Sequence, residues 1–139
     1  MSITSPQLKL DNDLDTLART LWGEARGEGL RGMEAVAAVI MNRVRDPRRW
    51  GKTASQVSLQ PKQFSAWNAR DPNRPLMLRV SKSNKQFAQA LEIAERALAG
   101  NLEDPTGGAN HFHTHRVHPV WSRGKTPTAV IGNHRFFRL

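Results

Sequence analysis

Apolar side chains recur at helical spacing in three stretches of the chain, and these stretches predict its helices. Residues 11–22 carry leucine and alanine three and four positions apart, behind aspartates suited to a first helical turn, so we expect a helix that runs to about Glu24. Residues 33–44 form a second apolar face with hardly a polar residue in the middle, which is typical of a buried central helix. A third amphipathic helix is predicted over residues 84–99.

Shorter elements and turns connect these helices. Thr53 is suited to cap a short helix in TASQVSLQ, residues 53–60, and residues 61–75 are expected to be mostly loop. The proline and glycines of EDPTGGAN, residues 103–110, indicate turns. We find no repeat, low-complexity tract or linker, which favours one domain over residues 1–139.

The C-terminal part has the pattern of extended chain. HFHTHRVHPVW, residues 111–121, and TAVIGNHRFF, residues 128–137, are predicted to be extended and to pair as a small sheet. Gly132 and Asn133 supply a tight turn, and Phe136 is expected to pack inward. The whole pattern predicts a mainly helical α+β domain with a small C-terminal β part.

Positive charge is unevenly spread along the chain. The 139 residues include 21 lysines and arginines against 12 aspartates and glutamates, a formal net charge of +9, and no acidic residue follows Asp104. A basic surface attracts polyanions such as nucleic acid, anionic membrane or anionic wall polymer. A nucleic-acid-binding module is therefore one alternative, but no recognition motif accompanies the charge, so we expect no specific nucleic-acid partner.

Composition and the N-terminal sequence limit the setting of the protein. The chain contains no cysteine, which excludes disulfides and thiol chemistry. The opening MSITSPQLKLDNDL lacks the basic and apolar regions of a signal peptide, and no run of about 18 apolar residues occurs. We therefore expect a monomeric protein that is made in the cytoplasm and has no membrane span.

Two glutamates in LWGEARGEGL, at the end of the first predicted helix, are the first candidates for chemistry. Glu24 and Glu28 stand four residues apart on one helix face, where two carboxylates repel each other. They are solvated at an exposed helix end, paired with an arginine, or separated in pKa. A glutamate beside Trp22 and an apolar wall would have a raised pKa and keep its proton near neutral pH, as a general acid toward a glycosidic oxygen must.

Five motifs, taken in order along residues 17–137, resemble the cell wall hydrolase family of spore-cortex-lytic enzymes. They are ARTLWGEARGE, GMEAVAAVIMNRV, QPKQFSAWN, DPTGGANHFHTHRVHPVW and IGNHRFF. The resemblance implies a lysozyme-like, lytic transglycosylase-like fold that forms one catalytic domain, 1–139. Spore enzymes of the family usually carry an export signal and a wall-binding domain, and we expect neither in this chain. The resemblance also implies cleavage of the glycan strand of peptidoglycan without metal or cofactor. The catalytic acid of the family is the first glutamate of G-E-A-R-G-E, which is Glu24 here.

The resemblance implies a mechanism that needs only one carboxyl group. Glu24 would protonate the oxygen that leaves N-acetylmuramic acid (MurNAc), and its carboxylate would then take the proton of that sugar's own 6-hydroxyl, which closes a 1,6-anhydro ring. Ordinary glycoside hydrolysis uses two carboxyl groups. The sequence offers no convincing second one, although Glu103 and Asp104 lie in a predicted turn, so hydrolysis by a muramidase stays open.

Further residues are candidates for supporting the acid and holding the sugar. In the family the Q-F-S block lies at the cleft, which makes Gln63 and Ser65 predicted substrate-binding residues. Trp67 is either a stacking platform for a sugar ring or a side chain half-buried under a loop. Glu28 either supports Glu24, by holding a neighbouring segment and by like-charge repulsion, or lies at the surface.

The histidines from His111 to His118 raise a rival hypothesis. H-x-H on a strand projects two imidazoles to one side, so His111 and His113 suggest a zinc-dependent amidase or peptidase. The helical H-E-x-x-H signature is absent, and we interpret His111 or His113 as hydrogen-bonding residues of the cleft wall, with no metal. His134 is either a structural histidine or a cleft residue.

The basic, compact chain suits a bacteriophage or prophage endolysin within this family resemblance. Such an enzyme is stored in the cytosol, is released through a membrane lesion, and acts on the wall from the host periplasm. Its partners would be peptidoglycan glycan strands, and the basic C-terminal segment favours contact with the anionic cell envelope.

Overall fold

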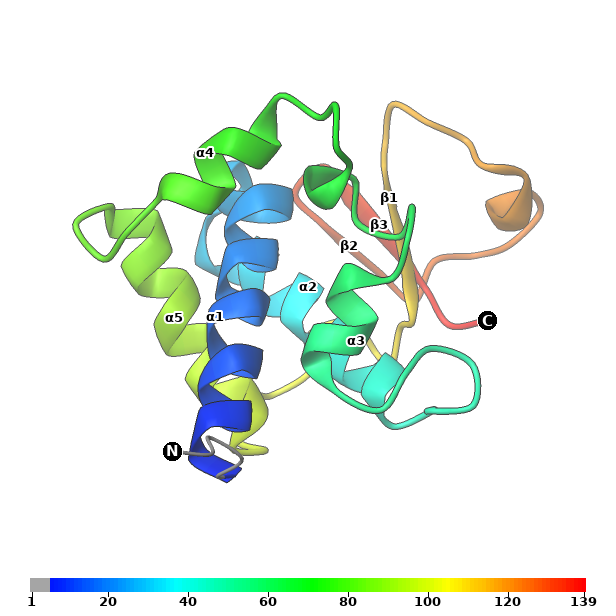
Figure 1. Cartoon of the computed structure of the whole chain (residues 1–139). Coiled ribbons are helices and arrows are strands. Elements are labelled where there is room, and N and C mark those ends of the chain that lie inside the picture. Colours follow the sequence, from blue (N-terminus) through cyan, green and yellow to red (C-terminus); the bar gives the residue numbers. More distant parts are fainter. Residues whose placement is uncertain (1–5) are drawn as a thin grey trace.

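Residues 6–98 contain the α-helices, and residues 111–137 contain a small sheet (Figure 1). The computed structural model describes residues 6–139, with side chains described from residue 12 onward. The elements in chain order are α1 (Pro6–Ala25), η1 (Arg26–Glu28), α2 (Gly29–Val44), α3 (Ala54–Leu59), η2 (Ser65–Trp67), α4 (Asn73–Arg79), α5 (Lys85–Leu98), β1 (His111–Thr114), η3 (Val120–Ser122), β2 (Ala129–Ile131) and β3 (His134–Phe137). The predicted mainly helical α+β organisation is confirmed.

Helix α1 begins earlier than its sequence pattern predicted. It starts at Pro6, so the aspartates assigned to a first turn lie inside the helix. Two of them make other contacts there: Asp15 pairs with Arg19 one turn later, at 3.0 Å. Asp13 accepts hydrogen bonds from the backbone N–H and hydroxyl of Ser55, at 3.1 and 2.6 Å, and so ties α1 to the start of α3. The predicted end, about Glu24, is confirmed to within one residue.

The main core lies between α1, α2 and α5. In Figure 1 α5 lies at the left and the sheet at the right, with α1 and α2 between them. Helix α2 is the buried central helix that its apolar run predicted, with every residue from Ala35 to Ile40 buried. Full burial of a leucine or isoleucine side chain stabilises a fold by roughly 1.5–3 kcal/mol, and Leu17, Leu21 and Ile40 are all 0% exposed.

Helix α5 follows its local signals closely. The Asn84 side chain accepts a hydrogen bond from the backbone N–H of Phe87 at 3.0 Å and caps the helix start. Gly100, with φ +76, lies directly after the last residues of the helix, as predicted. The short helix α3 is likewise capped by Thr53, whose side chain accepts from the N–H of Gln56.

Helix α4 was not predicted. Residues 61–75 were expected to be mostly loop, and α4 begins within them at Asn73. Pro75 lies in the first turn of α4, where its missing N–H costs no helical hydrogen bond, so this proline is compatible with a helix. The carboxylate of Asp71 accepts the N–H of Asn73 at 2.8 Å and satisfies one donor of this helix start.

The three strands form one antiparallel sheet in the order β1-β3-β2. Gly132, with φ +57, lies in the turn that joins β2 to β3, as the sequence predicted. Phe136 is fully buried and joins Ala35 and Val39 of α2 in a second core cluster beneath the sheet. The expectation of extended chain over residues 111–121 is only partly correct, because the strand ends at Thr114 and a loop with η3 follows.

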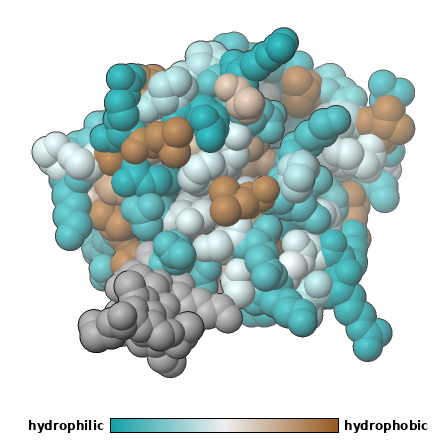
Figure 2. All heavy atoms as spheres, viewed as in Figure 1, coloured by the Kyte–Doolittle hydropathy of each residue, from teal (hydrophilic) through white to brown (hydrophobic). Residues whose placement is uncertain are grey.

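The surface is polar over most of the face seen in Figure 2, and apolar side chains occur there as separate spots. No helix within residues 6–139 is long and apolar enough to cross a membrane.

Candidate active site

Glu24 lies in the last turn of α1, where η2 and α4 pack closely against the helix. The residue before it explains this close approach. A Cβ atom on Gly23 would lie 2.7 Å from Cβ of Ala66 in η2 and 2.9 Å from Sδ of Met77 in α4. Only glycine therefore lets both segments close over the end of α1, which places Glu24 in their shelter.

The environment of Glu24 keeps its proton near neutral pH. The pKa of Glu24 is raised from 4.5 to about 7: burial raises it most and the charge of Asp71 adds to this, whereas hydrogen bonds from Ala66 and Ser65 act in the opposite direction. The Ser65 hydroxyl donates to Oε2 of Glu24 at 3.4 Å. Glu24 is half-buried rather than sealed off, so a protonated carboxyl group remains within reach of a ligand. This combination is what a general acid requires.

The carboxylate that acts on Glu24 by like charge is Asp71, not Glu28 as the sequence suggested. Oε2 of Glu28 instead lies 3.5 Å from the backbone nitrogen of Asn133, in the turn between β2 and β3. A Cβ atom on Gly132 would come within 2.6 Å of the same oxygen. Glu28 is therefore seated against the β2–β3 turn, and glycine at position 132 makes room for it.

Ser65 and Gln63, the predicted binding residues of the Q-F-S block, are both exposed. Ser65 touches Glu24 directly, and Oε1 of Gln63 accepts a hydrogen bond from Arg43 at 3.3 Å. Trp67 differs from the predicted stacking platform, since its indole N–H donates to the hydroxyl of Thr20 at 2.8 Å and its ring packs against the main core. The half-buried alternative describes Trp67.

The two histidines predicted for the cleft wall have different surroundings. His113 is 7% exposed, its ring stacks on Phe137 at 5.2 Å, and its Nδ1 lies 2.7 Å from the carbonyl oxygen of Thr114. Neighbouring side chains cover most of His113, so this packing gives no support to the prediction that His113 offers a hydrogen bond to substrate. His111 is half-buried and keeps an accessible edge.

The structure also bears on the role of His134 and on the hypothesis of a zinc site. His134 is 4% exposed, and its ring lies edge-on to Phe112 at 5.2 Å, as expected of a structural histidine. Burial lowers its pKa, so the ring is neutral at neutral pH. Among the residues that the structure describes, no three histidine, aspartate or glutamate side chains converge as a metal site, so the zinc hypothesis gains no support from the geometry.

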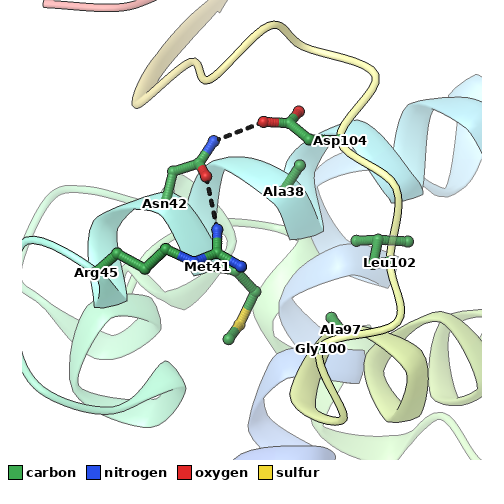
Figure 3. Close-up of a pocket in the computed structure, with 8 residues that line it drawn as sticks. All are labelled: Ala38, Met41, Asn42, Arg45, Ala97, Gly100, Leu102 and Asp104. Carbon is green, nitrogen blue, oxygen red and sulfur yellow. Dashed lines mark hydrogen bonds between the residues drawn. The ribbon is translucent and has the colours of Figure 1, made fainter.

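Asp104, considered as a second catalytic carboxylate, is occupied elsewhere. It accepts hydrogen bonds from Asn42, from Thr106 and from the N–H of Gly108. Burial alone would raise the pKa of Asp104, but these hydrogen bonds together lower it. Figure 3 shows Asp104 beside a cavity of about 50 Å³ between the C-terminal ends of α2 and α5, whereas Glu24 adjoins the N-terminal end of α2. Asp104 therefore stabilises the loop before β1 through these hydrogen bonds.

Sequence reasoning missed three residues around the site. Asp71 carried no signal because its effect on Glu24 depends on how the loop before α4 folds over α1. Trp50 and Trp121 were overlooked because nothing in the sequence shows that the loop after α2 and the segment after β1 come together at His111. Their rings flank His111, with centroids 5.2 and 4.9 Å from its own.

The fold and the site define a mainly helical domain with one sheltered, proton-holding glutamate at the end of its first helix. Comparison with known proteins places this domain. Residues 27–137 match the Cell Wall Hydrolase family, and the chain belongs to that family. The matched range begins after Glu24, so the role of that residue rests on the geometry of the site.

The curated relatives include spore cortex-lytic enzymes. That of Oceanobacillus iheyensis is 42% identical over 97% of this chain and 45% of its own length. That of Halalkalibacterium halodurans is 34% identical over 91% of this chain and 34% of its own length. The chain thus spans between a third and just under half of the length of these relatives.

Two solved structures share the fold. The catalytic domain of the Bacillus cereus SleB protein is 29% identical, with a TM-score of 0.73 over 92% of this chain and 91% of that domain. The catalytic domain of the germination-specific lytic transglycosylase SleB from Bacillus anthracis is 28% identical, with a TM-score of 0.72 over 99% of this chain and all of that domain. The predicted lysozyme-like fold and the family resemblance are confirmed.

Proposed function

We propose that the protein is a peptidoglycan-degrading glycosidase that cleaves the bond between MurNAc and N-acetylglucosamine (GlcNAc) as a lytic transglycosylase. One observation carries the proposal: the pKa of Glu24 is raised to about 7 in a half-buried position. The fold supports it, because the SleB domain of Bacillus anthracis that it matches is a lytic transglycosylase.

The proposed reaction moves one proton out of Glu24 and returns another. The neutral carboxyl group of Glu24 protonates the glycosidic oxygen as its bond to C1 of MurNAc breaks, and the GlcNAc end leaves as a neutral hydroxyl. The carboxylate then takes the proton of the 6-hydroxyl of the same MurNAc. O6 bonds to C1, the 1,6-anhydro ring closes, and Glu24 is neutral again. No water is consumed.

The hydrogen bonds of three other carboxylates support transglycosylation over muramidase hydrolysis. Hydrolysis would need a second carboxylate to activate water or attack the sugar. Asp71 accepts a hydrogen bond at the start of α4, Glu28 accepts one from the β2–β3 turn, and Asp104 accepts one from Asn42. Each of these three carboxylates therefore has another partner.

The physiological setting is a separate proposal. The excess of 21 basic over 12 acidic residues supports an enzyme that acts at an anionic cell envelope, as a phage endolysin made in the cytoplasm does. The relatives favour the spore cortex instead, since their printed name is spore cortex-lytic enzyme. Permeabilised vegetative cells and decoated spores, offered side by side to the purified protein, would decide between the two settings.

The products of digestion test the reaction itself. Purified peptidoglycan is incubated with the protein, and the soluble fragments are analysed by mass spectrometry. Fragments that end in 1,6-anhydro-MurNAc are expected. Reducing-end sugars would replace transglycosylation by hydrolysis, and released peptides would overturn the glycosidase assignment in favour of an amidase or peptidase.

A further inference from the structure

A buried arginine without a carboxylate partner organises one side of the domain. Arg43 is 4% exposed, and no ion pair with it is found in the part of the chain that the structure describes. Its Nε donates to the carbonyl oxygen of Asn110 at 2.8 Å and its Nη1 to Oε1 of Gln63 at 3.3 Å. Its guanidinium lies 4.1 Å from the ring centre of Trp50. Arg43 therefore contacts the residue before β1, the Q-F-S block and the loop after α2, and holds these three segments together.

Three half-buried rings form a row beside this arginine. Trp50 comes from the loop after α2, His111 from β1 and Trp121 from η3. The centroid of His111 lies 5.2 Å from that of Trp50 and 4.9 Å from that of Trp121. Indole rings offer the broad flat faces on which sugar rings stack, and each of these rings keeps part of its surface accessible. The guanidinium groups of Arg43 and Arg49 lie over the ring of Trp50, at 4.1 and 4.9 Å, so Trp121 is the indole of the row on which we expect a sugar to stack.

The row also presents a hydrogen-bond acceptor and donors. Nδ1 of His111 lies 2.7 Å from Oδ1 of Asn110, an oxygen that only accepts, so Nδ1 carries the hydrogen. Burial and the neighbouring cations lower the pKa of His111 to about 4, so the ring is neutral and its Nε2 holds a lone pair. Oε1 of Gln63 accepts a hydrogen bond from Arg43, so the amide N–H groups of Gln63 are the donors that it can present to a ligand. Hydroxyl and N-acetyl groups need such partners.

Positively charged side chains lie near the row. The guanidinium of Arg49 lies 4.9 Å from the ring centre of Trp50, and both Arg49 and Lys125 act electrostatically on His111. Nη1 of Arg49 pairs with Asp46 at 3.7 Å and donates to the backbone oxygen of Leu139 at 2.9 Å, whereas the salt bridges found among the described residues do not include Lys125. The balance of charge favours a ligand with a negative substituent.

We propose that Trp50, His111 and Trp121, ordered by Arg43, form a glycan subsite away from the cleaved bond, for a sugar ring that carries a negatively charged substituent. The inference rests on the proposed function, since it takes the ligand to be a further residue of the same strand. Gln63 and Ser65 connect the two places. They are two residues apart, and one contacts Arg43 while the other contacts Glu24.

Binding can be measured separately from catalysis in a Glu24→Gln background. Co-sedimentation gives the affinity for purified peptidoglycan, which carries carboxylates, and for chitin, a neutral polymer of GlcNAc. Trp121→Ala is expected to weaken binding to both polymers roughly tenfold, the value of one lost aromatic stack. Val120→Ala, at the neighbouring residue that is 74% exposed, serves as the matched control and should bind as the parent does.

A charge variant tests the acidic part of the ligand. Lys125→Glu should weaken binding to peptidoglycan roughly two- to fivefold and leave binding to chitin unchanged. Lys85→Glu carries the same change at the start of α5, on the other side of the molecule in Figure 1, and should change neither. Both lysines are exposed, so this pair reports on binding even if Trp121→Ala lowers the melting temperature.

Two results would overturn the subsite. One is a folded Trp121→Ala protein that binds both polymers as tightly as its parent, which would make the row a packing cluster only. The other is an equal effect of Lys125→Glu and Lys85→Glu on peptidoglycan. The proposed function fails differently: the wild-type protein would then release no glycan fragments, while the Trp121→Ala and Lys125→Glu variants would still lose polymer binding.

Discussion

Replacing Glu24 by glutamine should stabilise the fold at alkaline pH while it removes the acid. The amide has the shape of a protonated carboxyl group and no charge. In the wild-type protein the folded state holds the proton of Glu24 up to a pKa of about 7, whereas the unfolded chain releases it near 4.5. Below pH 4.5 both states are protonated and the ionisation of Glu24 costs nothing. As pH rises from 4.5 to about 7, the unfolded state ionises first and the wild-type fold loses stability.

The size of this effect follows from the two pKa values. Each pH unit between 4.5 and about 7 costs the fold about 1.4 kcal/mol, which gives an upper limit of about 3–4 kcal/mol. Partial access of water to the carboxyl group reduces the measured value, so a difference of roughly 1–3 kcal/mol is expected above pH 7. Glu24→Gln lacks this cost at every pH.

Urea unfolding of both proteins at pH 4.5, 6 and 8 measures the difference. The free energies of unfolding should nearly coincide at pH 4.5 and separate in favour of Glu24→Gln toward pH 8. All other titrating groups are shared and cancel in the comparison. A difference that does not change with pH would refute the raised pKa, and a wild-type protein that gains stability relative to the variant would reverse its sign.

Three further outcomes concern the site. Peptidoglycan cleavage should slow as pH rises above about 7, because Glu24 then ionises, and a rate that keeps rising in alkaline buffer would contradict this. Asp71→Asn should move that decline to lower pH, because the charge of Asp71 helps to raise the pKa of Glu24; an unmoved profile would exclude Asp71. Gly132→Ala and Gly124→Ala should each lower stability by roughly 1–2 kcal/mol, because both glycines have a positive φ. Gly132→Ala should lower it more, because of the two new Cβ atoms only that at position 132 would meet a side chain, Glu28. Equal losses in urea would mean that this contact adds nothing. Treatment with a chelator should leave the cleavage rate unchanged, and loss of activity restored by zinc would revive the amidase hypothesis.

The elements that the sequence predicted well are those with strong local signals. The uninterrupted apolar run of α2 is stable only when it is buried. Asn84 marks the start of α5 because its side chain caps the helix, and Gly100 marks the end because it adopts a positive φ. Helix α4 was missed because residues 61–75 were expected to be mostly loop, although Pro75 in the first turn leaves the helix intact.

The sequence predicted the residues of the site only where a family motif contains them. Glu24 followed from the motif, but the sources of its raised pKa did not, because burial by η2 and α4 and the charge of Asp71 arise from tertiary folding. His111 and His113 are equivalent by strand alternation, and packing separates them: Phe137 covers His113, whereas His111 stays half-buried between two tryptophans. Spacing along one strand cannot show which side chains another segment will cover.

The release of soluble glycan fragments from peptidoglycan by the wild-type protein and by Glu24→Gln, measured side by side under native conditions, tests the central role of Glu24 most directly. Loss of a general acid lowers a rate typically by about 100- to 10,000-fold, so the account predicts a loss of at least about 100-fold in a variant that remains folded. An undiminished rate of release by Glu24→Gln would contradict the account.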